Sequence, residues 1–135
     1  MLNTTTNLMD EYFGLIHEIE RLKNLESNTE HLLKYSFTPK CPSELANQLR
    51  IDLSQSIQSR DKLEAKLDEV ASELYNENNI TLLINKQNDL ESFINVLEDS
   101  PQFSEEAGGM IDNPYLSTQK NALGIFNKHF AELIS

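Results

Sequence analysis

Two long stretches of the chain place apolar residues at alternating steps of three and four, which is the spacing of one face of an α-helix. One repeat occupies residues 8–32 and the other occupies residues 46–74. The octapeptide SFTPKCPS separates them, and its two prolines interrupt the helical hydrogen-bond ladder. Because so short a connection turns the chain back along itself, we expect helices over about 6–35 and 43–76 that form a long antiparallel, coiled-coil-like hairpin.

The rest of the chain predicts two shorter helices, over about 80–99 and 114–134, after a break at the tract NENN. Asparagine favours such breaks because its side chain competes for the backbone hydrogen bonds. The five residues after the break, ITLLI, also fit a short β-strand by their branching and periodicity. A lone strand would leave its backbone groups unpaired, so a helix is favoured over a strand for residues 80–84.

These elements predict an all-α, four-helix fold in a single domain over residues 1–135. Hydrophobic residues make up 39% of the chain and charged residues 24%, which suits a globular domain rather than a disordered tail or a membrane protein. No apolar stretch approaches the roughly 20 residues that a membrane-spanning helix needs. We therefore expect a cytoplasmic protein without a membrane partner.

The predicted helices differ in length between the two halves of the fold. At the rise of an α-helix, the hairpin helices reach roughly 45 and 50 Å and the last two helices about 30 Å each. Part of the apolar stripe of the hairpin is then left for a second copy or another protein to cover. The candidate partner-binding residues are the seam of the second helix and the aromatic face of the last one: Leu63, Leu67, Val70, Leu74, Phe126 and Phe130.

Two polar side chains interrupt that stripe. Ser56 and Arg60 fall at inward positions of the second helix, where a polar residue costs stability and can fix register or partner choice. The alternative is that Arg60 lays its aliphatic stem along the seam and keeps its charged head in water. The alternative is favoured, because long cationic side chains usually stay solvated at their tips.

Charge is the other strong feature of the sequence. Twenty-two acidic against eleven basic side chains give a formal net charge of -11, which argues against direct binding of nucleic acid. No basic residue lies between Lys86 and Lys120, and the proline and glycines over 100–113 predict a mobile acidic loop. The acidic candidates for contacts with a basic partner are Asp89, Glu98, Asp99, Glu105, Glu106 and Asp112.

The residues that usually carry catalysis are few and scattered. Neither His17, His31 nor His129 has the Glu-x-x-His spacing of di-iron bundles, so we expect no metal and no cofactor. Cys41 is the single cysteine and follows Lys40 in the connection, which is weak support for a reactive thiol. The pair Gly108 and Gly109 lacks the lysine of a phosphate-binding loop. The sequence therefore predicts no catalytic residue and no enzyme.

The function that fits these features is a non-enzymatic protein-interaction module: an adaptor, an assembly subunit or a cytoplasmic chaperone-like protein. We expect it to self-associate and to bind a partner with a basic surface. The alternative is an acidic inhibitor that imitates nucleic-acid phosphates and occupies a nucleic-acid-binding enzyme. Charge and size permit this alternative, but the regular spacing of carboxylates that mimicry requires is not visible. Competition with nucleic acid would distinguish the two hypotheses.

Overall fold

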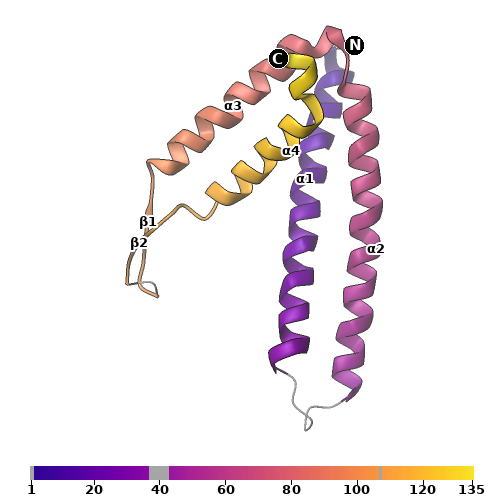
Figure 1. Ribbon diagram of the computed structural model, residues 1–135, viewed down its shortest axis with the longest axis vertical. Coiled ribbons are helices and arrows are strands. Elements are labelled where there is room, and N and C mark those ends of the chain that lie inside the picture. The colour runs from indigo at the N-terminus through magenta and orange to yellow at the C-terminus, as the bar shows by residue number, and fades with distance from the viewer. Residues whose placement is uncertain (1, 37–42, 107) are drawn as a thin grey trace. The chain divides into compact units, whose positions relative to one another are not determined.

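The computed structural model describes residues 2–36, 43–106 and 108–135 and shows the expected all-α fold with four helices (Figure 1). In chain order the elements are α1 (Leu2–His31), a π-helical turn η1 (Leu32–Ser36), α2 (Ser43–Leu74), a 3₁₀ turn η2 (Glu77–Asn79), α3 (Ile80–Glu98), β1 (Gln102–Ser104), β2 (Gly109–Ile111) and α4 (Leu116–Ile134). Cys41 and the prolines of the connection lie outside the described residues. Among the described helices, none combines the length and the apolar character that crossing a bilayer requires.

The chain divides into two compact units. One unit comprises residues 10–70, which form most of α1 and α2. The other comprises residues 1–9 and 71–135, which include η2, α3, both strands and α4. A single domain over residues 1–135 stays a prediction.

In the first unit, α1 and α2 pack side by side and run in opposite directions, as expected (Figure 1). Ion pairs show the register, because Glu26 meets Arg60 while Lys23, three residues earlier, meets Glu64, four residues later. The core of this unit consists of buried apolar side chains that follow the three-four spacing of both helices: Tyr12, Ile16, Ile19, Leu22, Leu67 and Val70. Burial of each such aliphatic side chain contributes about 1.5–3 kcal/mol.

The predicted break after α2 is confirmed, and asparagine side chains make it. The Oδ1 atom of Asn76 accepts a hydrogen bond from the backbone N–H of Asn78 at 2.9 Å. The Nδ2 atom of Asn79 donates to the carbonyl of Leu74 at 3.0 Å. This second bond satisfies a carbonyl that the end of a helix leaves open. The chain then re-enters a helix at Ile80, so the strand alternative for residues 80–84 is wrong.

Helices α3 and α4 form the antiparallel pair of the second unit (Figure 1). Gln87 donates to Asn127 at 2.8 Å, and further along the pair Lys120 lies 3.2 Å from Glu98. A small apolar cluster joins the helices near the end of α3 and the start of α4: Ile94, Leu97 and Leu116, with Leu123 packed against them. The pair therefore has apolar packing of its own, flanked by polar contacts.

Helix α4 begins at Leu116, two residues after the predicted start. The Oδ1 atom of Asn113 accepts the backbone N–H of Tyr115 at 3.0 Å, and the carbonyl of Asn113 accepts the N–H of Leu116 at 2.9 Å. Asparagine readily forms such a turn with its own side chain. The turn takes up the residues between the asparagine and the helix, so Pro114 lies ahead of α4 rather than inside it.

Within residues 100–113, for which the sequence predicts a mobile acidic loop, β1 and β2 pair as an antiparallel hairpin. The cross-strand pairs are Gln102 with Ile111, Phe103 with Met110, and Ser104 with Gly109. At the turn the N–H of Gly108 donates to the carbonyl of Glu105 at 3.2 Å. Gly108 has φ 72, a backbone conformation that costs other residues free energy. The glycines that suggest a loop therefore close a hairpin; its mobility stays a prediction.

Candidate protein-interaction site

The structure places most of the predicted seam residues in the interior. Leu63 is half-buried, whereas the other five candidates, Leu67, Val70, Leu74, Phe126 and Phe130, are buried within a single copy of the chain. The rings of Phe126 and Phe130 lie with their centroids 4.9 Å apart, which is a favourable aromatic contact. The five buried side chains stabilise the fold of a single copy, and contact of these candidates with a partner stays a prediction.

The acidic candidates, in contrast, are all at the surface: Asp89, Glu98, Asp99, Glu105, Glu106 and Asp112. Glu98 forms an ion pair with Lys120 across α3 and α4. Within the described part of the chain, the other five carboxylates have no cation within ion-pairing distance. Four of them flank or cap the β-hairpin, so the structure groups them around one element.

That hairpin also carries two of the three most exposed large apolar side chains among the described residues. Phe103 is 67% exposed and Met110 is 63% exposed, and the two lie directly opposite each other on the paired strands. Tyr115 and Ile111 are exposed close by along the chain. Side chains paired across antiparallel strands project from the same face. The β-hairpin thus presents a small apolar face inside an acidic surrounding, which the sequence analysis did not identify.

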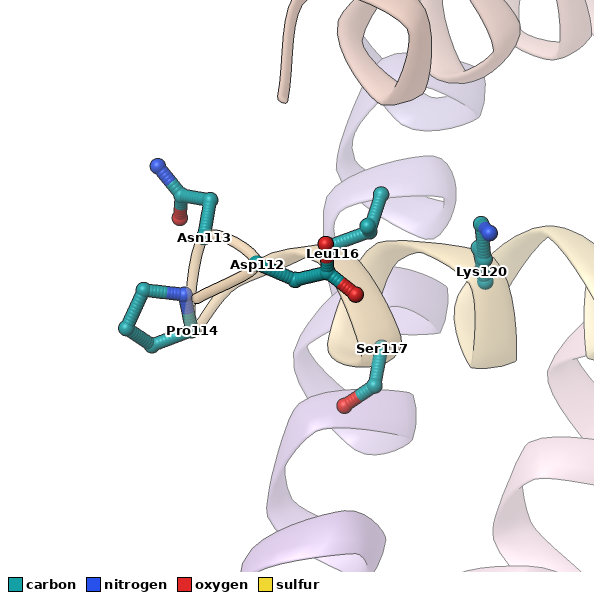
Figure 2. A pocket seen from close by; sticks show the side chains of 6 residues that line it. All are labelled: Asp112, Asn113, Pro114, Leu116, Ser117 and Lys120. Carbon is teal, nitrogen blue, oxygen red and sulfur yellow. The ribbon is translucent and has the colours of Figure 1, made fainter. Parts of the chain in front are cut away.

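A pocket of about 290 Å³ lies where β2 leads into α4 (Figure 2). It is lined by Asp112, Asn113, Pro114, Leu116, Ser117 and Lys120. Lys120 is paired with Glu98, and Ser117 has no hydrogen-bonded base among the described residues. The pocket therefore lacks an activated nucleophile. It adds a recess with one free carboxylate, that of Asp112, beside the β-hairpin.

In the first unit a buried polar cluster interrupts the apolar seam. The Nε atom of Arg60 donates to both carboxylate oxygens of Glu26, at 2.8 and 3.0 Å, and Glu26 is itself buried. Arg60 also pairs with Glu64 at 3.3 Å. The hydrogen bond that Arg60 donates to Glu26, and the negative charge of that carboxylate, raise the pKa of the Arg60 guanidinium. The charged head is therefore held by carboxylates of both helices, while the Arg60 side chain remains 24% exposed; the solvation of its tip stays a prediction.

Ser56 completes this interruption. Its side chain is buried, and its hydroxyl oxygen has no hydrogen-bond partner among the described residues. Thr29, on the facing stretch of α1, is also buried, and its hydroxyl donates to the carbonyl of Leu25 at 2.8 Å. The inward position predicted for Ser56 is confirmed. The role of Glu26 could not be predicted, because nothing in an acidic sequence distinguishes a buried glutamate from an exposed one.

Beyond the polar cluster the helical hairpin has little core. Between Glu30 and Gln55, none of the side chains that the structure describes is buried. Large apolar side chains are exposed in this part of both helices: Leu32 on the α1 side, and Leu45 and Ile51 on α2. The sequence prediction of an incompletely covered hairpin thus has a counterpart at its connecting end, although on other residues than those proposed.

The described residues offer little for metal or acid-base chemistry. They contain no group of three or more histidine, cysteine, aspartate or glutamate side chains placed to hold a metal ion. Burial raises the pKa of the Tyr12 phenol, and the carboxylate of Asp68 adds to the rise. A phenol shifted in this direction stays protonated and suits a structural role better than that of a general base.

No family model matches the chain, and neither a curated protein nor a solved structure does.

Proposed function

We propose that this chain is a non-enzymatic protein-interaction module that binds another protein through exposed apolar side chains surrounded by carboxylates. The observation that carries the proposal is the exposed pair Phe103 and Met110, held side by side by the strands of the β-hairpin. Large apolar side chains that a fold exposes together are a mark of interaction surfaces. The proposal requires no metal and no cofactor. We further propose a cytoplasmic location, in keeping with a single cysteine.

Self-association forms part of this proposal. The exposed leucine and isoleucine side chains of the helical hairpin are Leu25, Leu32, Leu45 and Ile51. Charges of both signs surround them, so a second copy would not meet a one-signed field there. Sedimentation equilibrium over a range that reaches tens of micromolar tests this part. A dimer that Leu45→Ser with Ile51→Ser dissociates would support it, and a compact monomer throughout would contradict it.

Capture of partners tests the proposal as a whole. The full chain serves as bait beside a variant in which Phe103→Ser and Met110→Ser remove the exposed pair. We expect proteins retained by the wild-type chain to be lost from the variant, because the two serines remove most of the apolar contact area. A strictly monomeric chain that retains no protein more strongly than the variant does would overturn the proposed function.

The acidic inhibitor remains a second candidate, and one observation favours it. Residues 71–135 carry ten acidic side chains against three basic ones, so the charge is concentrated in one part of the chain. An inhibitor of this kind must displace nucleic acid from its target, with a strong dependence on salt. It should tolerate loss of Phe103 and Met110 better than loss of carboxylates. Competition by the wild-type chain and by the serine variant therefore separates the two candidates.

A further inference from the structure

We propose that the β-hairpin from Gln102 to Ile111 is the docking surface for a basic protein segment that presents a large apolar side chain between lysine or arginine residues. This inference rests on the proposed function and names the partner class of the same site. Its basis is the apolar pair on one face of the hairpin together with the charge that surrounds it.

Within the part of the chain that the structure describes, the apolar pair is largely exposed to solvent. Phe103 and Met110 face each other in register and are about two-thirds exposed, at 67% and 63%. A two-stranded hairpin by itself is at best marginally stable in water. An apolar side chain laid across this pair would bury the ring and the thioether, which are adaptable contact surfaces. Docking would therefore stabilise the hairpin and the complex together.

The surrounding charge selects the partner. Glu105 and Glu106 lie in the turn, Asp99 precedes β1 and Asp112 follows β2. The described residues provide no cation within ion-pairing distance of any of these four carboxylates. Charges so close in the chain repel one another over distances on the order of the Debye length, about 8–10 Å. Lysine or arginine residues that flank an apolar anchor would neutralise them on contact.

The same charge argues against the other possible occupants. A second copy docked hairpin to hairpin would bring eight carboxylates together without a cation. A nucleic-acid backbone and an anionic membrane surface are repelled for the same reason. A neutral apolar segment would leave the carboxylates unneutralised. A basic segment with an apolar anchor is the occupant that satisfies both features of the hairpin.

The test is a binding titration of the full chain with three synthetic peptides of equal length. The first alternates lysine with leucine, the second has serine in place of leucine, and the third has glutamate in place of lysine. We expect the first peptide to bind best, because it alone supplies both charge and an apolar anchor. Its affinity should fall steeply with added salt, since exposed charges are screened.

Variants of the full chain assign the binding to the hairpin. The double variant Phe103→Ser, Met110→Ser should bind the first peptide at least about tenfold more weakly than the wild-type chain does, as expected when central anchors are truncated. The double variant Glu105→Gln, Glu106→Gln should also bind this peptide more weakly, and its affinity should depend less on salt. Phe93→Ser is the matched control, because Phe93 is an exposed aromatic side chain on α3, 46% exposed, outside the β-hairpin. It should change the affinity by less than about twofold.

Several outcomes would overturn the inference. Equal binding of the glutamate peptide, no binding of the lysine-leucine peptide, or unchanged binding by the Phe103 and Met110 variant each contradicts it. If Phe93→Ser weakens binding instead, the docking surface lies on α3, and the proposed function survives at another site. The proposed function fails separately, by the sedimentation and capture experiments. Unfolding curves of each variant test whether the fold is retained, which is expected for such exposed positions.

Discussion

The helical hairpin and the β-hairpin both expose large apolar side chains, but they differ in what lies beneath and around those side chains. In the helical hairpin, Ile51 and its exposed neighbours continue a stripe that has a buried core further along, at Leu67 and Val70. In the β-hairpin, the described residues provide no such core for Phe103 and Met110, and the charged residues next to them in the chain are of one sign. Exposure alone therefore does not define a partner; the local charge and the local stability do.

Truncation of a buried leucine in the helical hairpin should change the free energy of unfolding most and sharpen this comparison. Leu67→Ala truncates a leucine that is 6% exposed, so the free energy of unfolding should fall by about 2–5 kcal/mol. Leu45→Ala is the matched control, because the same change at a half-exposed position should stay within about 0.5 kcal/mol. Urea unfolding followed by circular dichroism measures both. Equal losses at the two positions would mean that the helical hairpin is covered evenly along its length.

The sequence predicted the helices well because regular spacing encodes them. The three-four repeats gave both long helices, and the tract from Asn76 to Asn79 marked the break. The same spacing could not say what covers an inward side chain. Leu67, Val70 and Phe126 were therefore proposed for a partner, while the structure buries them in the chain itself.

The candidate site was predictable only in its charge. The run without basic residues was visible in the sequence, and its carboxylates are exposed in the structure. The pair Phe103 and Met110 was missed because strands of three residues are too short for a period-two pattern. Apolar residues on either side of a glycine-containing turn were the available signal.

The polar cluster of the helical hairpin gives the second prediction. Glu26→Ala should lower the melting temperature by several degrees, because it removes a buried carboxylate and leaves Arg60 without its main partner. Glu26→Leu with Arg60→Met should recover the loss, since well-packed apolar residues often replace a buried ion pair without cost. Thermal unfolding of Glu26→Leu, of Arg60→Met and of the double variant measures the coupling. A double variant that is as unstable as the sum of its singles would show that the pair does not act as a unit.

Tyr12 gives a third prediction, for the covered end of the helical hairpin. Burial raises the pKa of its phenol, and Asp68 adds to the rise, whereas an unfolded tyrosine loses its proton near pH 10. The stabilisation is complete below about pH 10 and is lost as the pH rises further, because only the unfolded state then releases the proton. The free energy of unfolding should fall by up to about 1.4 kcal/mol per pH unit in that range.

Tyr12→Phe should remove this component, and Tyr115→Phe, at an exposed side chain, is the matched control. Chemical denaturation between pH 8 and 11, compared with the wild-type chain, isolates the effect of one hydroxyl. If the wild type and Tyr12→Phe lose stability in parallel above pH 10, the phenol is not the group responsible. The helical hairpin would then lack the tightly buried end that distinguishes it from the β-hairpin.

The smallest effect on the stability of the chain is expected from a substitution in the β-hairpin. This substitution tests whether the β-hairpin is preorganised for docking. Gly108→Ala places a side chain at φ 72, which costs roughly 1–2 kcal/mol locally. Gly109→Ala is the matched control, because Gly109 has negative φ and nothing within 4 Å of an added Cβ. Because Phe103 and Met110 are largely exposed, the strain should open the β-hairpin and leave the melting temperature of the chain nearly unchanged. Amide hydrogen exchange at Phe103 and Met110 should therefore rise by about tenfold in Gly108→Ala alone. A fall in the melting temperature as large as that of Leu67→Ala would show instead that the β-hairpin is part of the stable fold.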